Sequence, residues 1–110
     1  MLARVLVQRY PADVLTDEVV EKVRTDVLAT IRRQEGNRAV LLLLDRATGK
    51  AMSVSLWDGE EALGNSAQAA GQIKGEVSSL TGNTPMAEYE GYEVLALDLD
   101  DAVLSDGANR

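Results

Sequence analysis

The sequence contains no histidine and no cysteine among its 110 residues. Without cysteine no disulfide can form, and the redox compartment is not constrained. Without histidine the chain lacks the commonest general base, the Ser–His and Cys–His nucleophile pairs and any histidine ligand to haem or zinc. Soft-metal sites are excluded as well, because both of their main ligand types are missing. Any chemistry must come from tyrosine, charged side chains, backbone groups or the substrate itself, and we expect no metal and no cofactor.

Long apolar runs are also absent, and no stretch approaches the about 20 residues that a membrane-spanning helix needs. The first residues lack a charged segment followed by an apolar one and a small-residue cleavage site, so we expect no signal peptide and a cytoplasmic protein. The formal net charge is −7. An acidic chain argues against binding to nucleic acid or to an anionic membrane surface.

Length and composition are those of one globular domain, since 45% of the residues are hydrophobic and 26% are charged. We expect this domain over residues 1–99 and a disordered acidic tail over residues 100–110. A divalent cation bound by the tail is the alternative. The acidic residues of the tail, however, do not have the spacing of a calcium-binding loop, and the tail has no glycine at the position where such a loop requires one.

Residues 40–57 predict a β-hairpin, the element around which the chain is organised. Residues 40–44 form a continuous apolar run, as in a buried strand, and Gly49 can take the positive φ that closes the turn. Residues 51–57 alternate between an aliphatic face and a mixed face with two serines and the only tryptophan. We expect the aliphatic face to pack against helices. The mixed face should then meet a ligand cavity, a subunit partner or water.

The hairpin is preceded by a predicted strand and a predicted helix. Residues 1–10 again alternate between an aliphatic and a mixed face. Thr16 is placed to cap a helix that runs to about Gln34, and Gly36 follows as a stop signal. The apolar residues of this helix recur every three or four positions, so one stripe should face the sheet.

A second helix and a last strand follow the hairpin. The helix is expected over residues 59–80, with a kink at Gly71, and the strand over residues 86–99, with a bulge at residues 90–91. The order strand, helix, strand, strand, helix, strand predicts an α+β, ferredoxin-like βαββαβ domain. Its sheet has four antiparallel strands, with both helices on one face and the other face open.

This order, with SLWDGEEAL at residues 55–63, resembles the antibiotic biosynthesis monooxygenase-like family of the dimeric α/β-barrel superfamily. The resemblance covers roughly residues 1–99, and its most specific part is Trp57 closing a strand, followed by an acidic residue and Glu61. It implies a homodimer whose open sheet faces form a barrel, with a pocket between sheet and helices or within the barrel. The sequence departs from the family at Gly59, where serine or threonine is frequent, and in the absence of a histidine from the second helix.

The resemblance implies several activities. Some members look like cofactor-independent monooxygenases that oxidise phenolic or anthrone-like aromatics with dioxygen, and others degrade haem with a histidine that this chain lacks. Our hypothesis is therefore a cofactor-free monooxygenase of a small phenol-, quinol- or anthrone-type aromatic. The alternative is a non-catalytic, small-molecule-binding or structural homodimer of the same fold. A cavity of about 300 Å³ or more, lined by Trp57, Ser53, Ser55 and Arg4, would favour the enzyme.

Arg4 and Tyr92 are the candidate catalytic residues. Arg4 would stabilise a phenolate or enolate, and Tyr92 would supply the weak acid that a site without histidine needs. The alternatives are structural: Arg4 would pair with an acidic residue across the dimer, and Tyr92 would be an interface aromatic.

The candidate substrate-binding residues are polar or aromatic side chains on the mixed faces and beside the expected bulge: Gln8, Tyr10, Ser53, Ser55, Trp57 and Tyr89. Trp57 would line an aromatic pocket beside the two serines, while Gln8 or Tyr10 would orient the substrate by hydrogen bonding. Alternatively, Trp57 is a packing residue at the end of its strand, with a partner for its indole N–H.

Overall fold

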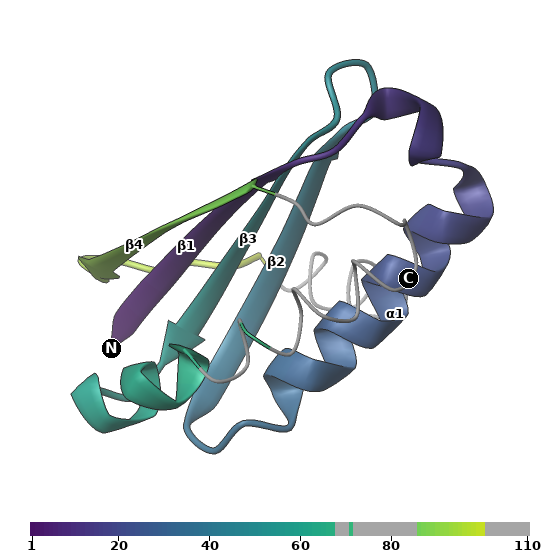
Figure 1. Cartoon of the computed structure of the whole chain (residues 1–110). Helices are drawn as coiled ribbons and strands as arrows, with labels where there is room; N and C mark the ends of the chain where they lie inside the picture. The colour runs from purple at the N-terminus through teal and green to yellow at the C-terminus, as the bar shows by residue number, and fades with distance from the viewer. Residues whose placement is uncertain (68–70, 72–85, 101–110) are drawn as a thin grey trace.

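The protein is described here by a computed structural model that covers residues 1–67, 71 and 86–100. Its elements in chain order are β1 (Leu2–Arg9), the 3₁₀ turn η1 (Ala12–Val14), α1 (Asp17–Arg32), β2 (Asn37–Asp45), β3 (Lys50–Trp57) and β4 (Met86–Glu93). Residues 60–67 are helical and begin the second helix. The predicted α+β class and the predicted element order are confirmed (Figure 1).

The four strands form one sheet in the order β2-β3-β1-β4, and every neighbouring pair is antiparallel. This is the ferredoxin-like arrangement that the sequence predicts. α1 lies beside β2 on one side of the sheet (Figure 1). Ala62, from the second helix, shares a core cluster with Val27 and Ile31 of α1, so both helices cover the same face.

α1 begins and ends where its sequence signals predict. The Thr16 hydroxyl accepts a hydrogen bond from the Val19 amide at 3.3 Å and so satisfies one of the unpaired N–H groups of the first turn. The first turn is acidic and the last carries Arg32, which suits the helix dipole. Gly36 follows with a φ of 85°, a left-handed conformation that glycine adopts without strain.

The β2–β3 turn rests directly on the end of β1. Gly49 has a φ of 78°, as predicted, and its amide donates to the Asp45 carbonyl at 2.9 Å. The Tyr10 amide in turn donates to the Gly49 carbonyl at 2.9 Å. A Cβ at Gly49 would lie 1.9 Å from the Tyr10 carbonyl oxygen, so only glycine fits this contact. The turn thereby fixes the backbone of Tyr10.

The predicted orientation of the sheet is wrong, because the mixed face packs against the helices. Tyr10 and Trp57 belong to the core cluster formed with Val27 and Ile31 of α1. The serines of β3 do not prevent this burial. A serine side chain is small, and the hydroxyl of Ser55 is paired with the indole of Trp57. Two large aromatic side chains therefore decide which face is buried.

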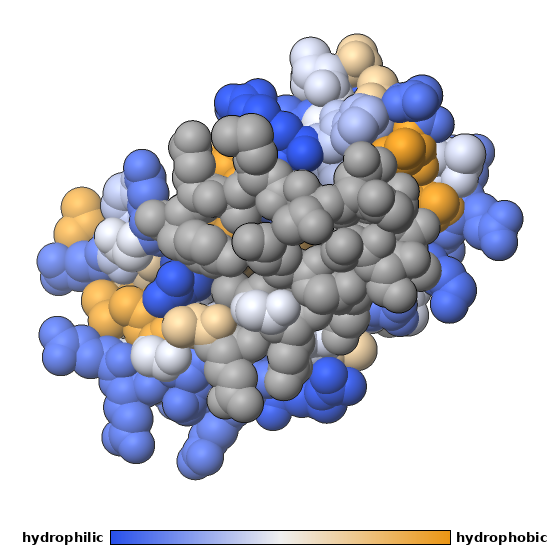
Figure 2. Space-filling model, viewed as in Figure 1, coloured by the Kyte–Doolittle hydropathy of each residue, from blue (hydrophilic) through white to orange (hydrophobic). Residues whose placement is uncertain are grey.

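The open face of the sheet is the aliphatic one. Leu41 is 54% exposed and Leu43 is 47% exposed, while Val5 and Val54 on the central strands are partly exposed. Alternation along the paired strands places these four side chains on the face opposite the helices. Among the residues that are coloured in the view of Figure 2, hydrophilic groups predominate and apolar groups form small clusters between them.

The last strand is shorter and more regular than predicted. β4 ends at Glu93, and its register with β1 is unbroken through Gly91, so the expected bulge is absent. Gly91 occupies an ordinary ladder position opposite Arg4. The irregularity of the sheet lies in β2 instead, between Asn37 and Ala39. The rest of the predicted second helix with its kink, and residues 101–110 of the tail, lie outside the described residues.

Candidate functional site

A cavity of about 170 Å³ lies between α1 and the helix-facing side of the sheet. Its walls are mainly apolar and include Val20, Val23 and Val27 of α1 and Leu42 of β2. Its polar lining consists of Gln8, Tyr10, Arg24 and Ser53. The cavity is smaller than the about 300 Å³ expected from the sequence, and three of the four residues expected to converge on it are not among its lining residues.

Tyr10 and Gln8 form a buried hydrogen-bonded pair in this lining. The Tyr10 hydroxyl donates to Gln8 Oε1 at 2.8 Å, and Tyr10 is only 6% exposed. Burial raises the pKa of Tyr10 to about 12, because desolvation disfavours the phenolate. At neutral pH Tyr10 is therefore a hydrogen-bond donor and not a base. The structure brings these two predicted residues together with Ser53, the third predicted residue in the lining.

Arg24 is a lining residue that the sequence reasoning missed. Its guanidinium hydrogen-bonds to the Glu21 carboxylate one turn earlier, with an Nε–Oε2 distance of 3.1 Å. This hydrogen bond raises the pKa of Arg24, so the side chain is a permanent cation. The position of Arg24 in the sequence could have predicted this. Arg24 lies four residues after Val20 and three before Val27, a spacing that places it on the sheet-facing stripe of α1.

Trp57 and Ser55 lie outside this lining and form a packing unit. Trp57 is 1% exposed and packs in the cluster that contains Ile31 and Ala62. Its indole Nε1 donates to Ser55 Oγ at 2.9 Å. A buried tryptophan with a satisfied N–H has the geometry of a core anchor, which matches the structural alternative considered for it.

The two candidate catalytic residues lie on opposite faces of the sheet. Arg4 pairs with Gly91 in the β1–β4 ladder, whereas Tyr92 pairs with Ala3. Successive strand residues point to opposite faces, so Arg4 is on the helix side and Tyr92 on the open side. Tyr92 is 49% exposed, and its hydroxyl donates to the Glu90 carboxylate. Within one chain these two residues therefore do not form one site, contrary to expectation.

Tyr89, the remaining candidate, lies opposite Leu6 in the β1–β4 ladder. Its side chain is outside the described part of the structure.

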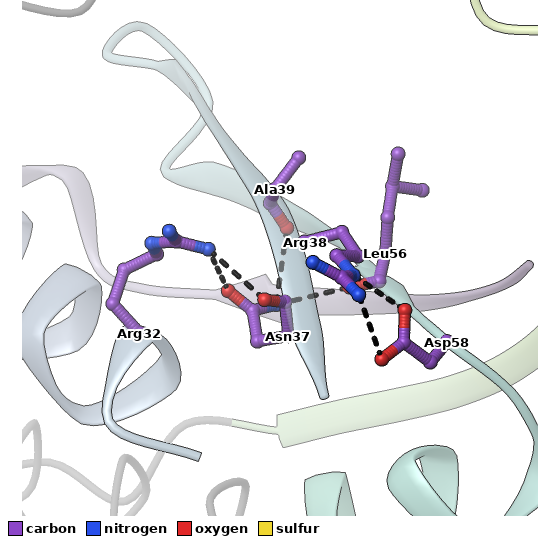
Figure 3. A network of polar contacts seen from close by, with 6 residues as sticks. All are labelled: Arg32, Asn37, Arg38, Ala39, Leu56 and Asp58. Atoms are coloured by element: carbon purple, nitrogen blue, oxygen red, sulfur yellow. Dashed lines mark hydrogen bonds and ion pairs between the residues drawn. The ribbon is translucent and has the colours of Figure 1, made fainter. Parts of the chain in front are cut away.

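A polar network joins the end of α1 to the sheet (Figure 3). Arg32 donates to Asn37 Oδ1 at 2.6 Å, and Asn37 Nδ2 donates to the Leu56 carbonyl at 3.1 Å. Nearby, the guanidinium of Arg38 forms two hydrogen bonds to the Asp58 carboxylate. The network bridges the irregular start of β2 and holds one end of α1. The cavity lies along the other end, whose N-terminal valines line it.

Within residues 1–67, 71 and 86–100, no group of three or more acidic, histidine or cysteine residues is placed to hold a metal ion. No helix in these ranges is both long enough and apolar enough to cross a membrane.

No family model matches the chain, but solved structures match most of its length. The cofactor-independent oxygenase SnoaB of Streptomyces nogalater is 15% identical with a TM-score of 0.61, and the match covers 87% of this chain and 94% of that one. The monooxygenase ActVA-Orf6 of Streptomyces coelicolor, solved with nanaomycin D, is 16% identical with a TM-score of 0.59 over 89% and 92% of the two chains. The chain has the antibiotic biosynthesis monooxygenase fold. The resemblance noted in the sequence is thus confirmed at the level of the fold.

Other proteins similar to this chain have no assigned activity. A protein of unknown function from Nitrosomonas europaea is 14% identical with a TM-score of 0.67, and the match covers 90% of this chain and 93% of that one. Uncharacterized proteins of two Mycobacterium tuberculosis strains are 29% identical over 84 residues, which are 76% of this chain. The matched region is only 37% of their length. The antibiotic biosynthesis monooxygenase fold alone therefore does not decide the reaction.

Proposed function

We propose that the protein is a cofactor-independent monooxygenase that oxidises a small, electron-rich aromatic of one ring with dioxygen. The observation that carries the proposal is the cavity beneath α1, which combines apolar walls with the buried Tyr10–Gln8 pair. Its volume of about 170 Å³ is close to the roughly 150 Å³ of an engineered cavity that binds benzene. This size favours a phenol or hydroquinone over an anthrone.

The reaction needs only the substrate and dioxygen. For the parent phenol, the phenolate gives electrons to dioxygen and a C–O bond forms at the para carbon. Loss of the para proton and cleavage of the O–O bond then yield the quinone and water. One oxygen atom enters the ring and the other leaves in the water, so phenol supplies all the electrons and no external reductant is needed.

In this proposal the protein stabilises the phenolate. The pKa of Tyr10, about 12, lies above the value of about 10 for an ordinary phenol. Tyr10 can therefore turn its hydroxyl from Gln8 to a bound phenolate, donate the hydrogen bond there and keep its own proton. The Gln8 amide and the Ser53 hydroxyl are further donors in the lining. Donors preorganised in a cavity of low dielectric stabilise an anion more strongly than water-exposed donors do.

The test combines calorimetric titration with oxygen uptake for phenol, hydroquinone and anthrone. We expect saturable binding of the single-ring compounds, with oxygen consumption that Tyr10→Phe strongly reduces. Tyr92→Phe serves as the matched comparison, because it removes a tyrosine hydroxyl from the opposite face. Binding without oxygen uptake would identify the protein as a non-catalytic binding module. No binding of any single-ring compound would contradict the proposal.

We also propose that the protein is a homodimer joined through the open face of the sheet. Leu41 and Leu43 are about half exposed on this face, and soluble monomers rarely expose a large contiguous apolar patch. A second copy would cover the patch with its own, in an isologous contact. Sedimentation equilibrium tests this proposal, and a monomer at micromolar concentration would refute it.

A further inference from the structure

Arg24 is a charged residue on the side of α1 that faces the sheet. Val20, Val23 and Val27 share this side, and all three line the cavity together with Arg24. Its side chain is 38% exposed, so it borders both the cavity and solvent. A position with three valine neighbours would usually carry another apolar residue. The cation is therefore placed where it can meet a ligand that enters the cavity.

The ion pair that holds Arg24 is of a kind that a ligand can replace. Glu21 approaches the guanidinium from a mostly exposed position, and exposed ion pairs contribute little stability. Guanidinium groups bind carboxylates through two parallel hydrogen bonds, and Glu21 already displays this geometry. A carboxylate on a ligand would find the same planar donor group at the cavity.

The two ends of the proposed ligand follow from the lining. Tyr10, Gln8 and Ser53 offer neutral hydrogen-bonding groups suited to a phenolic oxygen, while Arg24 offers the only cation among the described lining residues. The chain as a whole has a net charge of −7 and repels anions. Retention of an anionic ligand therefore requires a local cation such as Arg24.

We propose that the ligand of this cavity is a phenol that also carries a carboxylate, and that Arg24 binds the carboxylate. This inference rests on the proposed function and narrows its substrate class to hydroxylated aromatic acids. Arg24 is then a specificity-determining residue, and Glu21 is an internal competitor for its guanidinium.

The test compares 3-hydroxybenzoate, whose para carbon is free to react, with the neutral and nearly isosteric 3-hydroxybenzamide by calorimetric titration. We expect the acid to bind about tenfold more tightly than the amide, because a charge-assisted hydrogen bond replaces a neutral one. Arg24→Gln should abolish this preference with little effect on the amide, and Arg24→Lys should retain part of it. Glu21→Gln should strengthen binding of the acid. Lys22→Gln removes a cation from an exposed position of α1 and should leave the preference unchanged.

The outcomes separate the inference from the proposed function. Equal binding of acid and amide, or a preference that survives Arg24→Gln, would overturn the role of Arg24 and leave the phenol site intact. Binding of phenol itself but of neither the acid nor the amide would overturn the inference alone, and binding of no single-ring compound, phenol included, would overturn both. A thermal melt of each variant shows whether a lost preference arises from unfolding, and the unchanged affinity for the amide provides the same control within the titration.

Discussion

Substitution of Tyr10 by phenylalanine should change the stability of the protein in a way that depends on pH. The substitution removes the hydroxyl that donates to Gln8 Oε1 at 2.8 Å but keeps the ring in the core cluster. At neutral pH the loss should cost about 1–3 kcal/mol, since a buried hydrogen bond disappears and its acceptor stays buried. The variant should therefore be less stable than the wild type at pH 7.

This difference should shrink at high pH. The pKa of Tyr10 is about 12 in the folded protein and near 10 in an unfolded chain. Above pH 10 the unfolded chain loses this proton first, so ionisation favours unfolding. The stabilisation is complete below pH 10 and is lost as the pH rises through 12. At pH 11.5 the wild type should have lost about 2 kcal/mol of unfolding free energy from this group, and Tyr10→Phe none of it.

Urea unfolding followed by circular dichroism at pH 9 and pH 11.5 measures the effect. We expect the difference in unfolding free energy between the wild type and Tyr10→Phe to decrease by about 2 kcal/mol between these two pH values. Groups common to both proteins cancel in the comparison. A constant difference for Tyr10→Phe would refute the argument that the Tyr10 hydroxyl is desolvated.

Four further substitutions test the fold and the proposed dimer. Gly49→Ala should destabilise the protein by more than about 2 kcal/mol in urea unfolding, because its Cβ would collide with the Tyr10 carbonyl at a positive φ. Gly64→Ala meets no atom within 4 Å and should be neutral or slightly stabilising. Leu41→Asp should convert the proposed dimer to a folded monomer in sedimentation equilibrium, and an unchanged dimer would exclude the open face as the interface. Arg38→Gln removes an exposed ion pair and should leave the unfolding free energy almost unchanged, so a clear loss of stability in urea unfolding would show that the network of Figure 3 is cooperative.

The element order could be predicted because its signals are local. Thr16 caps α1, Gly36 ends it and Gly49 closes the hairpin, and each acts on backbone within a few residues of itself. The alternation within β1 and β3 was equally readable. These signals fix where each element starts and stops.

The orientation of the sheet could not be predicted from the same signals. Both faces of β1 and β3 carry apolar side chains. Which face is buried against the helices therefore depends on contacts between residues that are distant in sequence. Tyr10 and Trp57 meet Val27 and Ile31 across the two layers. The pairing of Ser55 with Trp57, only two residues away, was a possible clue that the serines could be buried. The face of the sheet that packs against the helices also determines which residues line the cavity. Ser53 and Tyr10 lie on that face and line the cavity, whereas Tyr92 lies on the open face.

The strand order also has a consequence for folding on the ribosome. β1 is synthesised before β2, β3 and β4, yet it lies between β3 and β4, and Leu2 pairs with Glu93. The β2–β3 hairpin can close early because its strands are adjacent in sequence, but one edge of β1 has no partner until β4 emerges. Pairing over such a separation is slow, since a long loop must first be closed. A nascent chain therefore exposes the backbone donors and acceptors along one edge of β1 until β4 has emerged, a stage at which unpaired strand edges favour misassembly.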